Sequence, residues 1–98
     1  MKRYTVDAYV LDVLMPDLVG HDRKPAAFLV YLCLLGAAER GNSPSVPISL
    51  QELAVRTGLA KSTVQSAIRH LTRRGLLDAG VLATTRQPLR RVAKPWVR

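Results

Sequence analysis

The chain has 98 residues, of which 48% are hydrophobic and 5% aromatic, and it carries a formal net charge of +8 at pH 7. This length suits one domain with a modest core, and the hydrophobic content excludes a disordered chain. One cysteine excludes an intramolecular disulfide, and with only two histidines no zinc-ligand spacing exists. The N-terminus does not resemble a signal peptide, because Asp7 and Asp12 interrupt its apolar residues. We therefore expect a cytoplasmic protein.

The positive charge is concentrated in the C-terminal part of the chain. Residues 1–60 contain six basic and six acidic residues, whereas residues 61–98 contain nine basic residues and only Asp78 as an acidic one. This asymmetry is typical of a protein that binds a polyanion. A membrane surface would attract the same charge, but the basic residues after Gly75 alternate with strand-forming residues and form no amphipathic helix. Nucleic acid is the expected partner, and no membrane contact is predicted.

The first expected element is a short helix over residues 7–15. Pro16 ends its pattern of apolar residues at helical spacing, which are Val6, Val10, Val13 and Leu14. A strand remains the alternative, because apolar residues also alternate between residues 4 and 10.

A hydrophobic helix is predicted over residues 24–39, with Pro25 in its first turn. Its uncharged run is shorter than the roughly 20 residues that span a bilayer. Two apolar stripes run along it, one with Phe28, Leu29, Leu32 and Leu35 and the other with Val30, Tyr31 and Leu34. A helix that is apolar on every side needs cover on every side. Two interpretations stay open: the N-terminal helix covers the second stripe within a monomer, or the stripe forms a homodimer interface.

Residues 48–77 predict a helix, a tight turn and a second helix. Ser49 and Glu52 have capping-box spacing at the start of a helix over residues 50–57, which Gly58 ends. A helix over residues 61–74 follows and ends at Gly75; its apolar face consists of Val64, Ala67, Ile68 and Leu71. Residues 46–48, just before this unit, are a candidate first strand of a small sheet.

The other face of the second helix carries hydrogen-bond donors and no carboxylate, namely Lys61, Ser62, Gln65, Ser66, Arg69 and Arg73. A polar outer face is often only solvated. Here, however, it follows a capped helix and a glycine turn and precedes a basic hairpin, which favours contact with DNA. Gln65 and Arg69 are the candidates for base edges, and Arg73 is a candidate for the backbone. The candidates for bases or phosphates are Lys61, Ser62, Thr63 and Ser66.

Residues 52–77 resemble the winged helix-turn-helix domains of bacterial transcriptional regulators. The matching residues are Glu52-Leu53-Ala54, Thr57-Gly58-Leu59, Lys61-Ser62-Thr63-Val64, and Leu71 before Arg74-Gly75-Leu76-Leu77. The resemblance implies a mostly helical α+β fold: a three-helix core with an N-terminal helix and a C-terminal β-hairpin wing. It also implies double-stranded DNA as the partner and regulation of transcription as the function.

A second resemblance keeps an alternative function open. Residues 10–16 and Leu18-Val19-Gly20 are similar to the N-terminal domain of phage and plasmid replication initiators. A winged-helix module that binds a protein instead of DNA is the other alternative.

After Gly75 the pattern changes to that of a β-hairpin over residues 76–97, with its tip at residues 84–88. This hairpin would be the wing. The basic residues at or near its tip and outer edge, which would reach phosphates, are Arg86, Arg90, Arg91 and Lys94. Trp96 is expected to anchor the tail on the core, with an oligomer contact as the alternative.

No catalytic site is expected. The glycines are too isolated to form a phosphate-binding loop, and the spacing of serine, histidine and aspartate suggests no catalytic triad. No cofactor, metal or small-molecule ligand is predicted. The sequence therefore predicts one winged helix-turn-helix domain over residues 1–98 that binds duplex DNA without catalysis.

Overall fold

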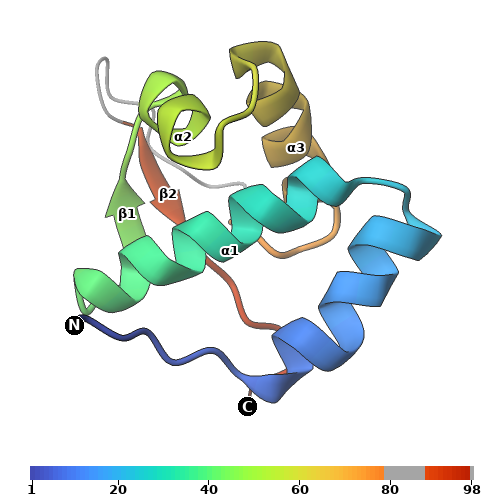
Figure 1. The fold of residues 1–98 in the computed structure, drawn as a ribbon, viewed down its shortest axis with the longest axis horizontal. Coiled ribbons are helices and arrows are strands. Elements are labelled where there is room, and N and C mark those ends of the chain that lie inside the picture. Colours follow the sequence, from blue (N-terminus) through green and yellow to red (C-terminus); the bar gives the residue numbers. More distant parts are fainter. Residues whose placement is uncertain (79–87, 98) are drawn as a thin grey trace.

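The computed structural model describes residues 1–78 and 88–97 of the chain. Two helical segments, η1 (Val10–Leu14) and η2 (Pro16–His21), precede the long helix α1 (Pro25–Arg40). Strand β1 (Ser45–Pro47), helices α2 (Leu50–Thr57) and α3 (Lys61–Arg73), and strand β2 (Leu89–Arg91) follow. Helix α1 crosses the middle of the molecule, between the N-terminal helical segments on one side and α2, α3 and the strands on the other (Figure 1).

The N-terminal helix is longer than the predicted 7–15 and does not end at Pro16. Its backbone is helical from residue 8 to residue 21 and has π-helical hydrogen bonds, such as the Met15 N–H to the Val10 carbonyl. Val10, Leu14 and Leu18 are buried at a constant spacing of four residues, which fits a winding wider than the 3.6 residues of an α-helical turn. Pro16 removes one donor, but this buried face and the contact of η2 with α1 continue the helix past it.

Helix α1 supplies the centre of the core. Val30, Tyr31 and Leu34 are fully buried, so the stripe that was expected to need cover is covered within one copy of the chain. The other stripe is only partly covered, because Leu29 is 45% exposed. The exposed part of α1 is therefore at Leu29, on the stripe with Phe28. The candidate dimer stripe of the sequence, with Tyr31, is buried.

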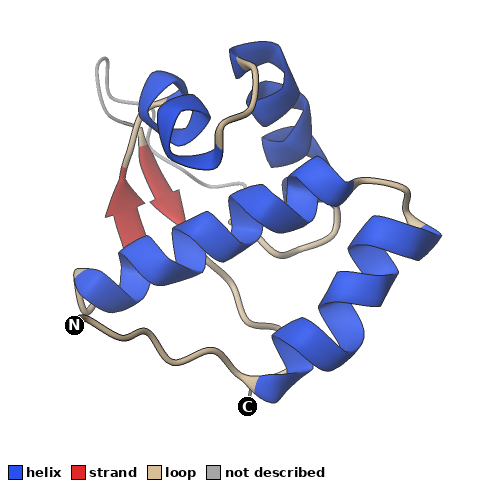
Figure 2. Ribbon diagram, in the orientation of Figure 1, coloured by secondary structure: helices blue, strands red, loops and turns tan. Residues whose placement is uncertain are grey.

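The two strands form an antiparallel pair in which Ser45 lies opposite Arg91 and Pro47 opposite Leu89. An antiparallel bridge between Leu77 and Val92 joins the two arms of the segment that was predicted to form the wing. The strand predicted over residues 46–48 is β1, which begins and ends one residue earlier. Both strands lie on the same side of α1 as α2 (Figure 2). Most of the predicted hairpin tip, including Arg86, lies outside the described residues.

Trp96 attaches the C-terminal tail to the N-terminal helix. Its ring stacks on Tyr9 with a centroid separation of 4.7 Å, and its Nε1–H donates to Asp7 Oδ2 at 3.1 Å. The Tyr31 hydroxyl donates to the Ala93 carbonyl at 2.7 Å and fixes the same segment to α1. Trp96 thus anchors the tail within one copy of the chain, as predicted.

The arrangement is a mostly helical α+β fold of the winged helix-turn-helix type. Helices α1, α2 and α3 pack against one another, and a small antiparallel sheet lies beside them. In the part of the chain that the structure describes, every helix is too short or too polar to cross a membrane.

Candidate nucleic-acid interface

Local hydrogen bonds define the helix-turn-helix. Ser49 Oγ caps α2 by accepting from the Glu52 N–H at 3.1 Å. The reciprocal half of the predicted capping box is replaced by an ion pair, because the Glu52 carboxylate accepts from Arg56 at 2.5 Å. Gly58 ends α2 with a φ of +76°, and Leu59 packs against the core. The turn therefore has the residues and the backbone conformation that direct α3 away from α2.

Helix α3 separates an apolar face from a polar one. Val64, Ala67 and Leu71 are buried. Thr63 and Ser66 are half-buried, and the remaining predicted contact residues of α3 are exposed, namely Lys61, Ser62, Gln65, Arg69 and Arg73. Within the described residues these exposed side chains have no hydrogen-bond or ion-pair partner. The five exposed contact residues therefore lie along one accessible face, whereas Thr63 lies at its border with the buried face.

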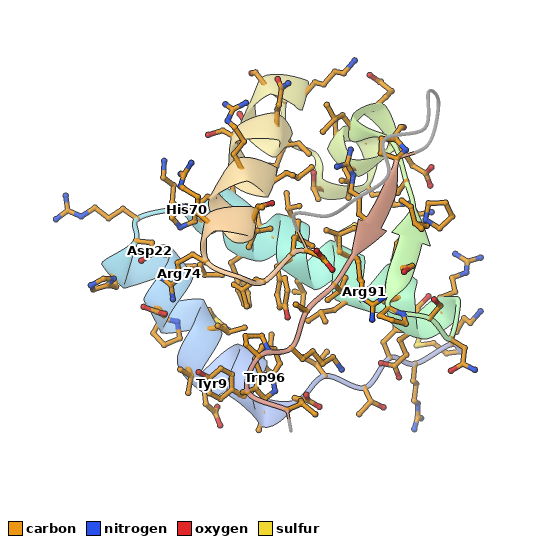
Figure 3. All side chains as sticks on the ribbon, turned by 180° about the vertical axis from the view of Figure 1, so that it is seen from behind. Tyr9, Asp22, His70, Arg74, Arg91 and Trp96 are labelled. Carbon is orange, nitrogen blue, oxygen red and sulfur yellow. The ribbon has the colours of Figure 1, made fainter. Side chains whose placement is uncertain are left out.

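The described basic residues of the predicted wing do not extend the exposed face of α3. Arg90 is half-buried, its Nε–H donates to the Ile48 carbonyl at 3.1 Å, and burial lowers the pKa of its guanidinium. Arg90 therefore joins β2 to the segment that leads into α2. Arg91 is exposed, but it lies on the opposite side of the molecule from the His70 end of α3 (Figure 3). Lys94 forms an ion pair with Asp7, with 3.9 Å between Lys94 Nζ and Asp7 Oδ2.

A cluster around Asp22 joins the end of the N-terminal helix to α3. The Asp22 carboxylate accepts from His70 Nε2 at 2.8 Å, from Arg74 at 2.5 Å and from His21 Nδ1 at 2.9 Å, and Figure 3 shows His70 and Arg74 converging on it. Both histidine nitrogens must be the donors, because an ionised carboxylate can only accept. The Asp22 side chain is 8% exposed. Asp22 is 48 residues from His70 and 52 from Arg74 in the chain, so no spacing in the sequence predicted this cluster.

The Asp22 cluster also changes the charge balance beside α3. Hydrogen bonds from His21 and His70, with the positive charge of Arg74, outweigh burial and lower the pKa of Asp22 to about 2. Arg74 pairs with Asp17 as well. Both carboxylates thus have hydrogen-bond or ion-pair partners within the fold. The side chains of Arg23 and Lys24, which follow Asp22 directly, have no such partner among the described residues.

Arg23 and Lys24 are interface candidates that the sequence analysis did not name. Together with Ser62, Thr63 and Ser66 of α3 they line a hollow of about 320 Å³, called the α1–α3 hollow below. A basic pair directly before the helix-starting Pro25 was the available signal. This pair did not predict a DNA contact, because the six basic and six acidic residues of the segment 1–60 give it no net charge.

A comparison with known families agrees with this geometry. Residues 24–77 match the model of a family described as a helix-turn-helix domain, and this span begins just before α1 and ends just after α3. No curated protein and no solved structure matches the chain.

Proposed function

Because this chain belongs to the helix-turn-helix domain family, whose model covers residues 24–77, we propose that it binds specific sequences of duplex DNA as a transcriptional regulator. In this proposal α3 is the recognition helix and enters the major groove, which is wide enough to admit an α-helix.

The exposed face of α3 is the observation that carries the proposal. Lys61, Gln65 and Arg69 follow one another at intervals of four residues, so their side chains project from one side of the helix. Arginine reads guanine and glutamine reads adenine by bidentate hydrogen bonds. Gln65 and Arg69 therefore have the chemistry for base edges, and Lys61 and Arg73 at the two ends have the charge for phosphates.

The orientation of α3 is set from both of its ends. At the first turns, Val64 is fully buried beneath the exposed face. In the last turn, His70 is hydrogen-bonded to Asp22, which belongs to a different element of the fold. A recognition helix that is held in this way keeps its backbone in place, so that binding has to order only its exposed side chains.

Fluorescence anisotropy of a labelled mixed-sequence duplex at low and moderate salt tests DNA binding. We expect the affinity to fall steeply with salt, and the Lys61→Ala/Arg69→Ala variant to bind at least about tenfold more weakly. Lys2→Ala/Arg3→Ala is the matched control, because it removes the same charge from the exposed N-terminal segment. Absence of binding at low salt, or equal losses in the two variants, would overturn the proposal.

The arrangement of the selected sites distinguishes regulation from the alternatives. Selection from a random duplex library should return one preferred sequence, in single or palindromic half-sites, if the protein regulates transcription. Cooperative binding to direct repeats would favour a replication initiator instead. A stable protein complex without salt-sensitive DNA affinity would favour a protein-interaction module.

A further inference from the structure

We propose that the α1–α3 hollow is a phosphate-binding site, in which Arg23 and Lys24 hold the DNA backbone on the α1 side of the recognition helix. This inference rests on the proposed function, and it adds a contact from the half of the chain that has no net charge in the sequence.

The chemistry of the hollow suits a phosphate group. Two basic residues of the segment before α1 line the hollow together with three hydroxyl-bearing residues of α3, which are Ser62, Thr63 and Ser66. A guanidinium, an ammonium and hydroxyl donors are the groups that hold phosphate oxygens in proteins. The carboxylate closest in sequence, that of Asp22, is directed to His70 and Arg74. The Asp22 carboxylate thus has its hydrogen-bond and ion-pair partners within the fold.

The backbone that carries the two cations is held in place. Arg23 has a φ of +55°, a left-handed conformation that residues other than glycine rarely adopt. Asp22 is tied to α3 on one side of this residue, and on the other the Lys24 N–H donates to the Leu18 carbonyl at 2.8 Å. Such a strained turn persists only where its surroundings hold it, and here they hold the backbone of both residues beside α3.

The hollow lies where a DNA strand would pass. A helix in the major groove has a sugar–phosphate backbone along each of its two sides. Ser62 is exposed beside Lys61 at the first turn of α3 and also lines the hollow, so the base-reading face and the hollow adjoin. When α3 occupies the groove, the hollow therefore faces the strand on the α1 side.

The test replaces both cations without adding backbone strain. Asparagine tolerates the left-handed conformation, so the variant is Arg23→Asn/Lys24→Gln, and Arg3→Asn/Lys2→Gln is the control of equal charge. Anisotropy titrations over a salt series should show a loss of affinity that is equal for all sequences, with a salt slope about 1 to 2 smaller. The control should keep the wild-type slope. Circular dichroism and the melting temperature verify that each variant folds.

The possible outcomes separate this inference from the proposed function. If wild type binds DNA, Lys61→Ala/Arg69→Ala loses binding and Arg23→Asn/Lys24→Gln keeps the wild-type slope, only the inference is overturned. If wild type binds no duplex at low salt, the proposed function fails and the inference with it. Thermal shift with inorganic phosphate identifies a free-anion site: stabilisation of wild type only, with an unchanged DNA slope, would overturn the backbone contact.

Discussion

His70 in the last turn of α3 donates its Nε2–H to Asp22 at 2.8 Å, across 48 residues of chain. This hydrogen bond connects α3 to the turn that carries Arg23 and Lys24. It therefore couples two parts of the proposed DNA interface, the base-reading face of α3 and the phosphate site before α1. Because its hydrogen bonds lower the pKa of this carboxylate, we also expect the stability of the fold to depend on pH.

Replacement of Asp22 should remove a pH-dependent part of the stability. Its pKa is about 2 in the fold against an ordinary value of 3.8, so the ionised carboxylate stabilises the fold above about pH 4. This contribution is lost as the pH falls from about 4 to 2, and it amounts to about 2 kcal/mol. Asp22→Asn should lower the free energy of unfolding by that amount at pH 7 and by much less near pH 2.

Urea denaturation at a series of pH values between 7 and 2 measures this effect. Asp12→Asn is the control, because the Asp12 side chain is exposed and has no hydrogen-bond or ion-pair partner among the described residues. A stability of Asp22→Asn that decreases with acid as steeply as that of wild type would contradict the assignment.

Arg69→Ala should relax sequence specificity. If Arg69 makes a bidentate contact with guanine, truncation costs about 1–3 kcal/mol at one base pair and leaves discrimination at the others intact. Binding of the selected site and its single-base-pair variants measures this. Arg73→Ala serves as the comparison and should weaken all sites equally. A uniform loss for Arg69→Ala as well would identify it as a phosphate contact.

Substitution by alanine should change the stability in opposite directions at two glycines. Both have room for a Cβ atom, but their backbone conformations differ. A Cβ on either Gly58 or Gly20 would meet no atom within 4 Å, but only Gly58 has a positive φ, of 76°. Gly58→Ala should therefore destabilise the fold by about 1–2 kcal/mol. Gly20→Ala, in the helical segment η2, should stabilise it by up to about 1 kcal/mol. Thermal unfolding of both variants checks the difference, and equal effects would contradict the backbone explanation.

Arg90 should contribute to stability and not to the salt dependence of DNA binding. Arg90→Met removes the hydrogen bond to the Ile48 carbonyl and keeps much of the side-chain length. We expect a loss of about 1 kcal/mol in the free energy of unfolding and an unchanged salt slope. A slope that falls by about one at unchanged stability would instead support the phosphate contact that the sequence suggested.

The exposed part of α1, at Leu29, is the surface through which a homodimer would form. Leu29 is 45% exposed, and Val19 on the N-terminal helix is 39% exposed. If a second copy packs on α1, Leu29→Glu should shift the protein from dimer to monomer in sedimentation velocity. Val55→Glu, at a 71% exposed residue of α2, is the control and should not change the sedimentation coefficient. A wild type that is monomeric at every concentration would exclude this interface.

The sequence predicted best what depends on neighbours in the chain. Helices α1, α2 and α3 begin and end within one residue of the predicted spans, because apolar periodicity and the caps at Ser49 and Gly58 act over one or two turns. The N-terminal helix departs from prediction for the opposite reason. The pattern treats Pro16 as a stop, whereas burial of Val10, Leu14 and Leu18 continues the helix past it.

The sequence by itself determined the helix-turn-helix and the polar face of α3, since both follow from residue types at short, regular spacing. Only the tertiary structure decided which charges remain available beside that face. An ion pair depends on which distant side chains meet, and no periodicity encodes the approach of Asp22 to His70 and Arg74. Because those contacts engage the Asp22 carboxylate, the side chains of Arg23 and Lys24 are left without an ion-pair partner next to α3 among the described residues.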